Sequence, residues 1–140
     1  MFIKVTAPIY VAIAKNPKRG KKYYLSFNNF HNWSPIQRSI IKNRYSEIIK
    51  AQLTNNSTRF TVNVKCSITY YPPDRRRHDL DNHTMLHAKF CNDALTEVGC
   101  WADDDCISEI TLKRGPLDKA NPRVELHYEI HTVTETINKL

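Results

Sequence analysis

Residues 60–70 read FTVNVKCSITY and form the clearest strand pattern of the chain. Hydrophobic side chains alternate with polar ones throughout, and this period of two predicts a strand with one buried and one solvated face. The sequence Tyr71-Pro72-Pro73 follows, and proline cannot continue a strand ladder because it lacks the amide hydrogen. A strand of this kind needs neighbours, so the flanking sequence decides the architecture.

The sequence before this strand predicts two strands and a helix. Apolar residues alternate over residues 3–13, and a basic turn over residues 16–22 leads to a short second strand, Tyr23–Phe27. Ser34-Pro35 then supplies a helix N-cap and a first helical position, and apolar residues recur at helical spacing as far as Leu53.

The sequence after the strand predicts a second helix over about Asn82–Val98 and two closing strands, Ile107–Leu112 and Val124–Ile130. The order ββαβαββ indicates an α+β fold in which a mixed β-sheet is covered by two helices. The chain has 140 residues, of which 41 % are hydrophobic, and it has no repeat or linker. We therefore expect one domain over residues 1–140.

The composition indicates the class of partner. Lys and Arg number 21 against 14 Asp and Glu, which gives a net charge of +7 and a pI near 9.3. Such a balance suits a polyanion such as nucleic acid, although a soluble protein can also be basic without one. No stretch approaches the roughly 20 apolar residues of a membrane helix. The four cysteines form no CxxC pair, so we expect a cytoplasmic protein with no membrane partner.

The segment Asp74-Arg75-Arg76-Arg77-His78-Asp79-Leu80-Asp81-Asn82 carries the most chemical information. In an extended chain Asp79 and Asp81 point to the same side, about 7 Å apart. Two carboxylates so placed can share Mg²⁺, which prefers one or two carboxylates together with water and substrate phosphate. The alternative is that Asp-x-Asp before a helix is only a helix cap.

A second acidic cluster, Asp103-Asp104-Asp105, follows the predicted second helix. Adjacent carboxylates are costly unless they are solvated, cation-bound or opposite a basic surface. Arginines beside carboxylates can recruit a phosphate, while the carboxylates hold a metal that activates water. This combination is expected of a nuclease, because a protein that only binds DNA has no need for the acids.

Four linked motifs together resemble the RusA family of Holliday junction resolvases. They are Asp74-Arg75-Arg76-Arg77, Asp79-Leu80-Asp81-Asn82, Asp93-Ala94-Leu95 and Gly99-x-Trp101-x-Asp103-Asp104. The resemblance implies that Asp79, Asp81 and Asp104 are catalytic, Mg²⁺-binding carboxylates, and that Lys89 is a catalytic lysine. Mn²⁺ can substitute for Mg²⁺ in this expectation, and no small-molecule cofactor is needed.

Three positions depart from the family pattern. Residues 83–88 separate Asn82 from Lys89, where the family usually has about two residues, so Lys89 lies farther from the acids. His78 stands where an arginine is common, and Cys106 replaces a common glutamine. The longer helix also spaces His83, His87 and Cys91 so that they could hold a transition metal, although packing on the flank of the core is the other interpretation.

The resemblance implies a Mg²⁺-dependent endonuclease that resolves four-way branched DNA by paired symmetric nicks, in recombination and repair in a bacterial or phage-infected cell. We expect the DNA-binding residues to be basic or amide side chains: Arg75, Arg76, Arg77, Lys18, Arg19, Lys21, Lys22 and Asn82. Two alternatives stay open. One is a non-catalytic basic protein that binds nucleic acid, and the other is a metal-dependent nuclease for another DNA or RNA substrate.

The distance between the acids predicts a homodimer. A helix over Asn82–Val98 is about 25 Å long, and the segment from Val98 to Asp104 spans at most about 20 Å when extended. Asp104 therefore barely reaches Asp79 and Asp81 of its own chain. Across a two-fold axis it could meet those of a second chain, which would give a homodimeric RusA-like fold with two sites. A shorter or broken helix would instead let one chain close its own site.

Overall fold

The computed structural model describes residues 1–13 and 21–131, and of Asp104 it describes the backbone alone. Four strands form the main sheet: β1 (Phe2–Pro8), β4 (Val64–Tyr71), β5 (Ile107–Arg114) and β6 (Arg123–Ile130). Their order across the sheet is β1-β6-β4-β5, with β4 and β5 parallel and the other pairs antiparallel. The predicted mixed sheet is therefore confirmed.

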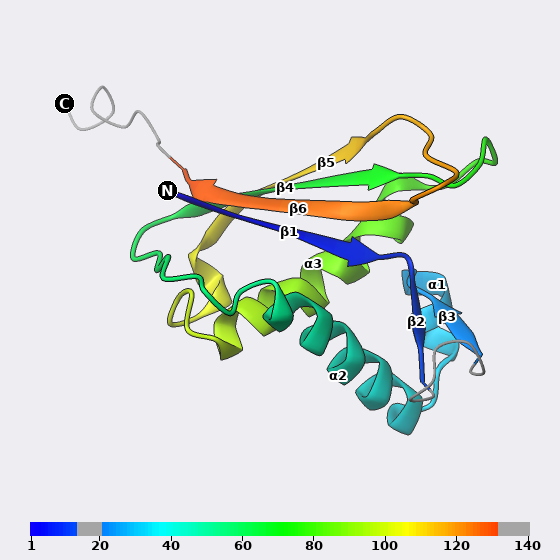
Figure 1. Cartoon of the computed structure of the whole chain (residues 1–140), viewed down its shortest axis with the longest axis horizontal. Coiled ribbons are helices and arrows are strands. Elements are labelled where there is room, and N and C mark those ends of the chain that lie inside the picture. Colours follow the sequence, from blue (N-terminus) through cyan, green and yellow to red (C-terminus); the bar gives the residue numbers. More distant parts are fainter. Residues whose placement is uncertain (14–20, 132–140) are drawn as a thin grey trace.

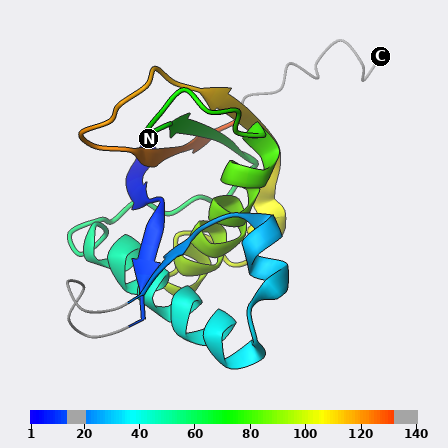
Figure 2. The same cartoon turned by 90° about the vertical axis from the view of Figure 1, so that its right-hand side faces the viewer.

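Two long helices cover one face of this sheet, as predicted (Figures 1 and 2). Helix α2 (Pro35–Ala51) begins with a capping box, in which Ser34 and Gln37 each bond to the other's backbone. Helix α3 (Leu80–Glu97) connects the parallel strands β4 and β5, since such strands need a crossover. The core lies between helices and sheet and consists of Val5, Ile41, Tyr45, Ile49, Ile68, Tyr70, Leu86, Phe90, Leu126, Tyr128 and their buried neighbours.

A smaller unit stands beside the main sheet and differs from the prediction. Strands β2 (Tyr10–Ala12) and β3 (Lys22–Tyr24) pair as a two-stranded ribbon, followed by the short helix α1 (Phe27–Asn32). The expected strand Tyr23–Phe27 is therefore wrong in its second half, because Ser26 caps α1 by accepting a hydrogen bond from the Asn29 amide at 3.2 Å. The described chain thus has three α-helices rather than two.

Other element boundaries differ by a few residues from those predicted from the sequence. Before Val64 the chain is not part of the sheet ladder, although Phe60 is buried and its amide donates to the Cys100 carbonyl at 2.7 Å. Helix α3 starts at Leu80, two residues earlier than expected. A short 3₁₀ helix, η1 (Asp104–Cys106), precedes β5. In the described parts of the chain, no helix has the length and apolar character needed to cross a bilayer.

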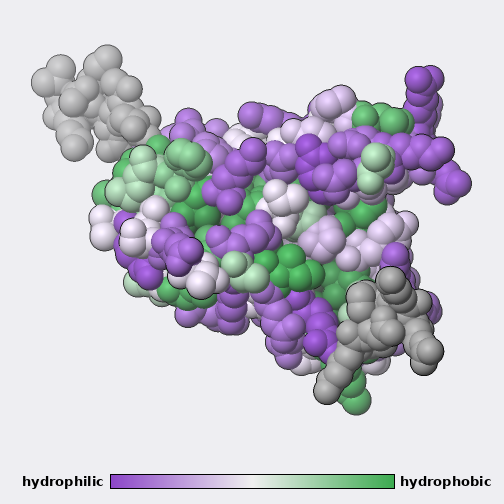
Figure 3. All heavy atoms as spheres, in the orientation of Figure 1, coloured by the Kyte–Doolittle hydropathy of each residue, from purple (hydrophilic) through white to green (hydrophobic). Residues whose placement is uncertain are grey.

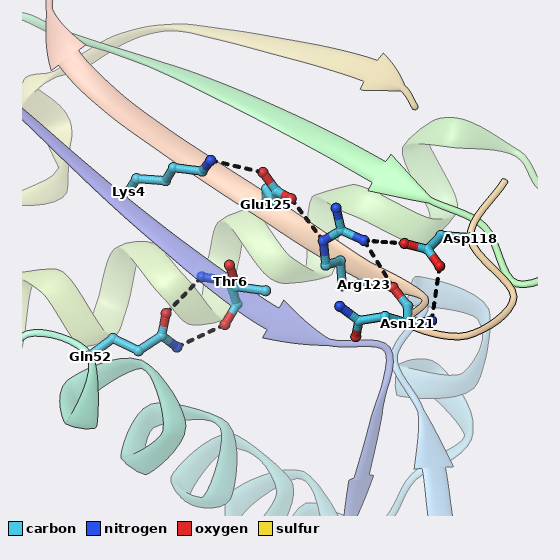
Figure 4. Close-up of polar contacts among 7 residues, drawn as sticks. All are labelled: Lys4, Thr6, Gln52, Asp118, Asn121, Arg123 and Glu125. Carbon is cyan, nitrogen blue, oxygen red and sulfur yellow. Dashed lines mark hydrogen bonds and ion pairs between the residues drawn. The ribbon is translucent and has the colours of Figure 1, made fainter. Parts of the chain in front are cut away.

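Polar contacts join the loop between β5 and β6 to the start of β6 (Figure 4), and the same loop is bonded to the end of β4. Arg123 donates to Asp118 at 2.7 Å and to Glu125 at 2.8 Å, and its guanidinium lies 4.0 Å from the centre of the Tyr71 ring. The Asp118 amide donates to the Pro72 carbonyl at 2.8 Å. Residues of the β5–β6 loop and of β6 therefore hold the end of β4 in place.

Candidate active site

Asp79 and Asp81 lie where the chain passes from β4 into α3. Asp79 is the N-cap residue, with extended backbone angles, but its side chain makes no capping hydrogen bond. Asp81 lies in the first helical turn. Both residues are exposed, and within the described chain neither carboxylate has a hydrogen bond or ion pair. The capping interpretation thus does not account for Asp79.

The two carboxylates line one open cavity of about 640 Å³ with Arg75, Arg76, Arg77, His78, Leu80, Leu112 and Arg114. Carboxylate oxygens are ligands that Mg²⁺ prefers, and those of Asp79 and Asp81 have no other bonding partner in the described chain. Guanidinium groups bind phosphate through two parallel hydrogen bonds. The donor set therefore fits a hard divalent cation next to a phosphodiester. The cavity joins the two predicted groups of residues, acidic and basic, at one end of the sheet.

The three arginines protrude into solvent on the loop between β4 and α3. In the view of Figure 3, hydrophilic residues gather at the right-hand end of the molecule, where Figure 1 shows this loop. Asp74 closes the loop, because its Oδ1 accepts hydrogen bonds from the Arg76 amide and from His78 Nε2, both at 3.0 Å. These bonds hold the pKa of Asp74 below its usual value. The arginine side chains are presented by a closed turn.

The other predicted DNA-binding residues are distributed around this end. Asn82 accepts a hydrogen bond from the Asn28 amide at 3.0 Å, which joins the start of α3 to α1. Lys21 and Lys22 are exposed on the β2–β3 ribbon, whereas Lys18 and Arg19 lie outside the described residues. Lys89 is exposed on α3, about 12 Å along the helix from Asp81, and its ammonium lies 5.5 Å from the Phe30 ring centre. Its catalytic role stays a prediction.

Asp104 lies at the opposite end of the sheet. Its backbone begins η1, immediately before β5, and β5 then runs the length of the sheet to Arg114 (Figure 1). Arg114 in turn donates to the carbonyl of His78, the residue before Asp79. A strand from Ile107 to Arg114 is about 23 Å long, so Asp104 and Asp79 of one chain are separated by roughly that distance. Among the side chains that the structure describes, which exclude that of Asp104, no three potential metal ligands lie together.

The three α3 residues considered for a transition metal contact three different tyrosines. His83 Nδ1 lies 2.6 Å from the Tyr24 hydroxyl on β3, and His87 Nδ1 lies 2.9 Å from the Tyr45 hydroxyl on α2. Cys91 is buried beside Tyr128 on β6, and burial raises the pKa of its thiol. These contacts attach α3 to three separate elements and do not bring the three side chains together around one point.

A cluster of aromatic and histidine rings lies directly behind the acids, and sequence analysis did not detect it. The Tyr24 and Tyr70 hydroxyls are 2.8 Å apart, and the ring centres of His78 and His83 are 4.9 Å apart. Burial raises the pKa of Tyr24 and lowers that of His83, so both are uncharged at neutral pH. The cluster connects the ribbon, β4 and the start of α3. No sequence signal links positions so far apart in the chain.

Arg114 is a second residue that sequence analysis missed. Its guanidinium enters the cavity of the acids from the end of β5 and donates to the His78 carbonyl at 2.6 Å. The signal in the sequence is weak, because a basic residue at the end of a strand is common on any solvated surface. Only the parallel pairing of β4 with β5 brings Arg114 to the loop that carries Asp79.

Comparison with known proteins identifies close similarity over most of the chain. The family model described as Endodeoxyribonuclease RusA matches residues 10–129. Crossover junction endodeoxyribonuclease rusA of Enterobacteria phage 82 is 30 % identical over 123 residues, which cover 88 % of this chain and 92 % of that protein. The protein of the same name from Escherichia coli K12 gives the same values. Its counterpart in Escherichia coli O139:H28 is 29 % identical over 119 residues, covering 85 % and 88 % respectively.

Proposed function

Because the chain belongs to the RusA family of endodeoxyribonucleases, we propose that it is a Holliday junction resolvase, which cuts four-way branched DNA by paired symmetric nicks. The observation that carries this proposal is the open cavity in which Asp79 and Asp81 lie beside a run of exposed arginines. Relatives named crossover junction endodeoxyribonucleases support the junction as the substrate. A role in recombination and repair in a bacterial or phage-infected cytoplasm is part of the same proposal.

Asp79 and Asp81 would hold Mg²⁺, or Mn²⁺ in its place. A divalent cation held by carboxylates supplies Lewis-acid stabilisation of phosphate charge and lowers the pKa of a coordinated water. The carboxylates suit this task because no described neighbour occupies their oxygens. Arg75, Arg76 and Arg77 would bind the phosphates flanking the cleaved bond, which fixes the position of the strand without reading its sequence.

The site needs a third carboxylate, and the proposal assigns it to a second copy of the chain. Asp104 of one chain lies roughly 23 Å from Asp79 of the same chain, as the length of β5 requires. Two-fold symmetry removes this separation if it places the start of one β5 beside the end of the other. Asp104 of the partner subunit would then complete the pair formed by Asp79 and Asp81, and the dimer would contain two such sites.

Strand β5 has the properties of the contact that this symmetry requires. It is an edge strand of the main sheet, so its outer backbone groups have no strand partner within the described chain. Ile110 pairs with the buried Cys66, yet it is itself 38 % exposed on this edge strand. Asp105 and Glu109 lie toward the start of β5 and Lys113 toward its end. Antiparallel pairing of two β5 strands would therefore place acidic residues opposite basic ones.

Cleavage of a labelled synthetic four-way junction, with and without Mg²⁺, tests the activity. Two nicks at symmetric positions are expected only with metal. Binding without cleavage would instead favour a non-catalytic DNA-binding protein. Equal cleavage of linear duplex DNA or of RNA would favour a nuclease of another specificity.

A mixture of two inactive variants tests the composite site. Asp81→Asn and Asp104→Asn protein, mixed under conditions that exchange subunits, should form heterodimers with one intact and one doubly damaged site. Such heterodimers should nick a single strand of the junction. If each chain closed its own site, every site would carry one damaged acid, and confirmed exchange would restore no nicking.

A further inference from the structure

Two residues outside the predicted ligand set, Asp74 and Arg114, hold His78, the residue immediately before Asp79. Asp74 bonds to the His78 ring from within the loop, and Arg114 bonds to the His78 carbonyl from the end of β5. His78 is thereby held through its side chain and through its main chain at once. It is also enclosed by rings, since its ring centre lies 5.7 Å from that of Tyr70 and 4.9 Å from that of His83.

The bonds of Asp74 and Arg114 reach His78 from two sides, one from within the loop and the other from the end of β5. Asp74 fixes the loop onto itself, through the Arg76 amide and the His78 ring. Arg114 attaches the loop to the sheet, and the next residue, Gly115, continues that attachment by donating its amide to the Tyr70 carbonyl at 2.8 Å. At Gly115 a Cβ would lie 2.8 Å from the Tyr71 ring, so the two strand ends approach closely here. The residue before Asp79 is therefore bonded to the end of β5, which is itself bonded to the end of β4.

Asp79 itself has no such support. Its side chain makes no capping bond, and its backbone carbonyl accepts from the His83 amide at 3.1 Å as the first helical turn requires. Nothing in the described chain orients its carboxylate except the path of the backbone. A carboxylate that must bind a cation gains affinity when its backbone is fixed beforehand, because less conformational entropy is lost on binding.

We propose that Asp74 and Arg114 are positioning residues for the metal site. Through His78 they hold the backbone of Asp79, and with it the spacing of Asp79 and Asp81, in the geometry that accepts a divalent cation. This inference rests on the proposed function, since it concerns the same site. Neither residue is assigned a contact with metal or DNA. Arg114 lines the same cavity, so a phosphate contact is the competing role that an experiment has to separate.

The test compares Arg114→Met with Arg114→Lys. Methionine keeps a long, unbranched side chain but has no hydrogen-bond donor, whereas lysine can still donate to the His78 carbonyl. Asp74→Ala removes the second bond, and Asp74→Asn keeps one acceptor oxygen. Lys119→Met is the matched control, because Lys119 is an exposed basic residue on the neighbouring loop. Three quantities are measured on the intact protein: Mn²⁺ affinity by calorimetry, the Mg²⁺ concentration for half-maximal junction cleavage, and the salt dependence of junction binding without metal.

For Arg114→Met and Asp74→Ala we expect Mn²⁺ binding to weaken by about 10-fold to 100-fold, the usual effect of removing a residue that orients a metal ligand. The half-maximal Mg²⁺ concentration should rise in parallel, and saturating Mg²⁺ should restore cleavage. Arg114→Lys and Asp74→Asn should recover part of the affinity. The salt dependence of binding should stay unchanged, as it should in Lys119→Met.

Unchanged Mn²⁺ affinity in both Arg114→Met and Asp74→Ala would overturn the inference. A flatter salt dependence in Arg114→Met with unchanged metal affinity would assign Arg114 to phosphate binding instead. If Arg114→Met does not fold, Asp74→Ala decides alone, because its bonds lie within one surface loop. Failure of the proposed function is distinguishable: the unmodified protein would bind Mn²⁺ but would not cut the junction, and the variants would still change the metal affinity.

Discussion

Asp79 and Asp81 are exposed carboxylates that make no bonds within the described chain, so they are available for metal. Asp79→Asn, Asp81→Asn and Asp104→Asn should each reduce junction cleavage at least about a hundredfold, the size of effect seen when a group that stabilises transition-state charge is lost. Binding of the junction should stay the same or become tighter, because a negative charge near phosphate is removed. Gel-shift and cleavage assays on the same protein check both statements. A fully active Asp81→Asn enzyme would contradict the metal assignment.

His87 gives the fold a dependence on pH. It is buried against Tyr45, its Nε2 has no partner in the described chain, and burial lowers its pKa to about 3. In the unfolded chain this histidine has an ordinary pKa near 6.5. Between pH 6.5 and about 3, therefore, the unfolded chain binds a proton at His87 and the folded chain does not. Stability from neutral His87 is present above pH 6.5 and is lost as the pH falls.

The free energy of unfolding should accordingly fall with each pH unit below 6.5, by at most about 1.4 kcal/mol per unit, which is the limiting value for one proton. Urea titrations between pH 6.5 and pH 5 measure this slope before most carboxylates titrate. His83, whose pKa is also lowered by burial, contributes in the same direction, so His83→Gln serves as the comparison. His87→Gln should reduce the dependence of the unfolding free energy on pH more than His83→Gln does. An equal slope in His87→Gln and the unmodified protein would contradict a neutral buried imidazole.

The loop between β4 and α3 carries three exposed arginines. Asp74 closes this loop through the backbone amide of Arg76. Replacing Arg75, Arg76 and Arg77 together by Ala should weaken binding to every DNA tested. The slope of log K against log salt should become shallower by about 0.9 for each lost phosphate contact. Fluorescence anisotropy over a series of salt concentrations measures it, with Lys119→Ala as the control. A slope that does not change would mean that the arginines face away from DNA.

The elements that the sequence predicted well are those with long periodic patterns. Helix α2 and strand β4 each bury one continuous row of side chains, so their hydrophobic period is visible without any tertiary information. Helix α1 has six residues, and none of them is buried, so it has no periodic pattern to detect. It forms because Ser26 caps it locally and because Asn28 and Phe30 contact α3, and only the cap could have been read from the sequence.

The candidate site was predictable to the extent that it is contiguous in sequence. Residues 74–82 contain the acids and arginines in one run, so their chemistry could be inferred directly. Arg114 reaches the same place only through the pairing of β4 with β5, and Tyr24 only through the hydrogen bond between its hydroxyl and His83. The segment 83–88, which separates Asn82 from Lys89, carries His83 and His87, and the hydrogen bonds of these two residues to tyrosines attach the segment to β3 and α2.

The complete molecule is expected to be a dimer joined along β5. Ile110→Lys places a charge on the exposed edge of β5, within the proposed contact, so it should convert the protein to monomers and abolish cleavage without unfolding it. Val62→Lys is the control, because Val62 is also exposed and apolar but lies outside the sheet. Sedimentation equilibrium and circular dichroism measure assembly and fold. A dimeric Ile110→Lys protein would exclude this edge as the interface.

Strand β6 pairs with β1 on one side and with β4 on the other, yet it comes last among the strands of the sheet. A ribosome must therefore release almost all of this sequence before β1 or β4 can find its antiparallel neighbour. Until then the growing chain can form helices but cannot close its core. A product that stops before Arg123 would lack a closed core and would be a substrate for cellular proteases.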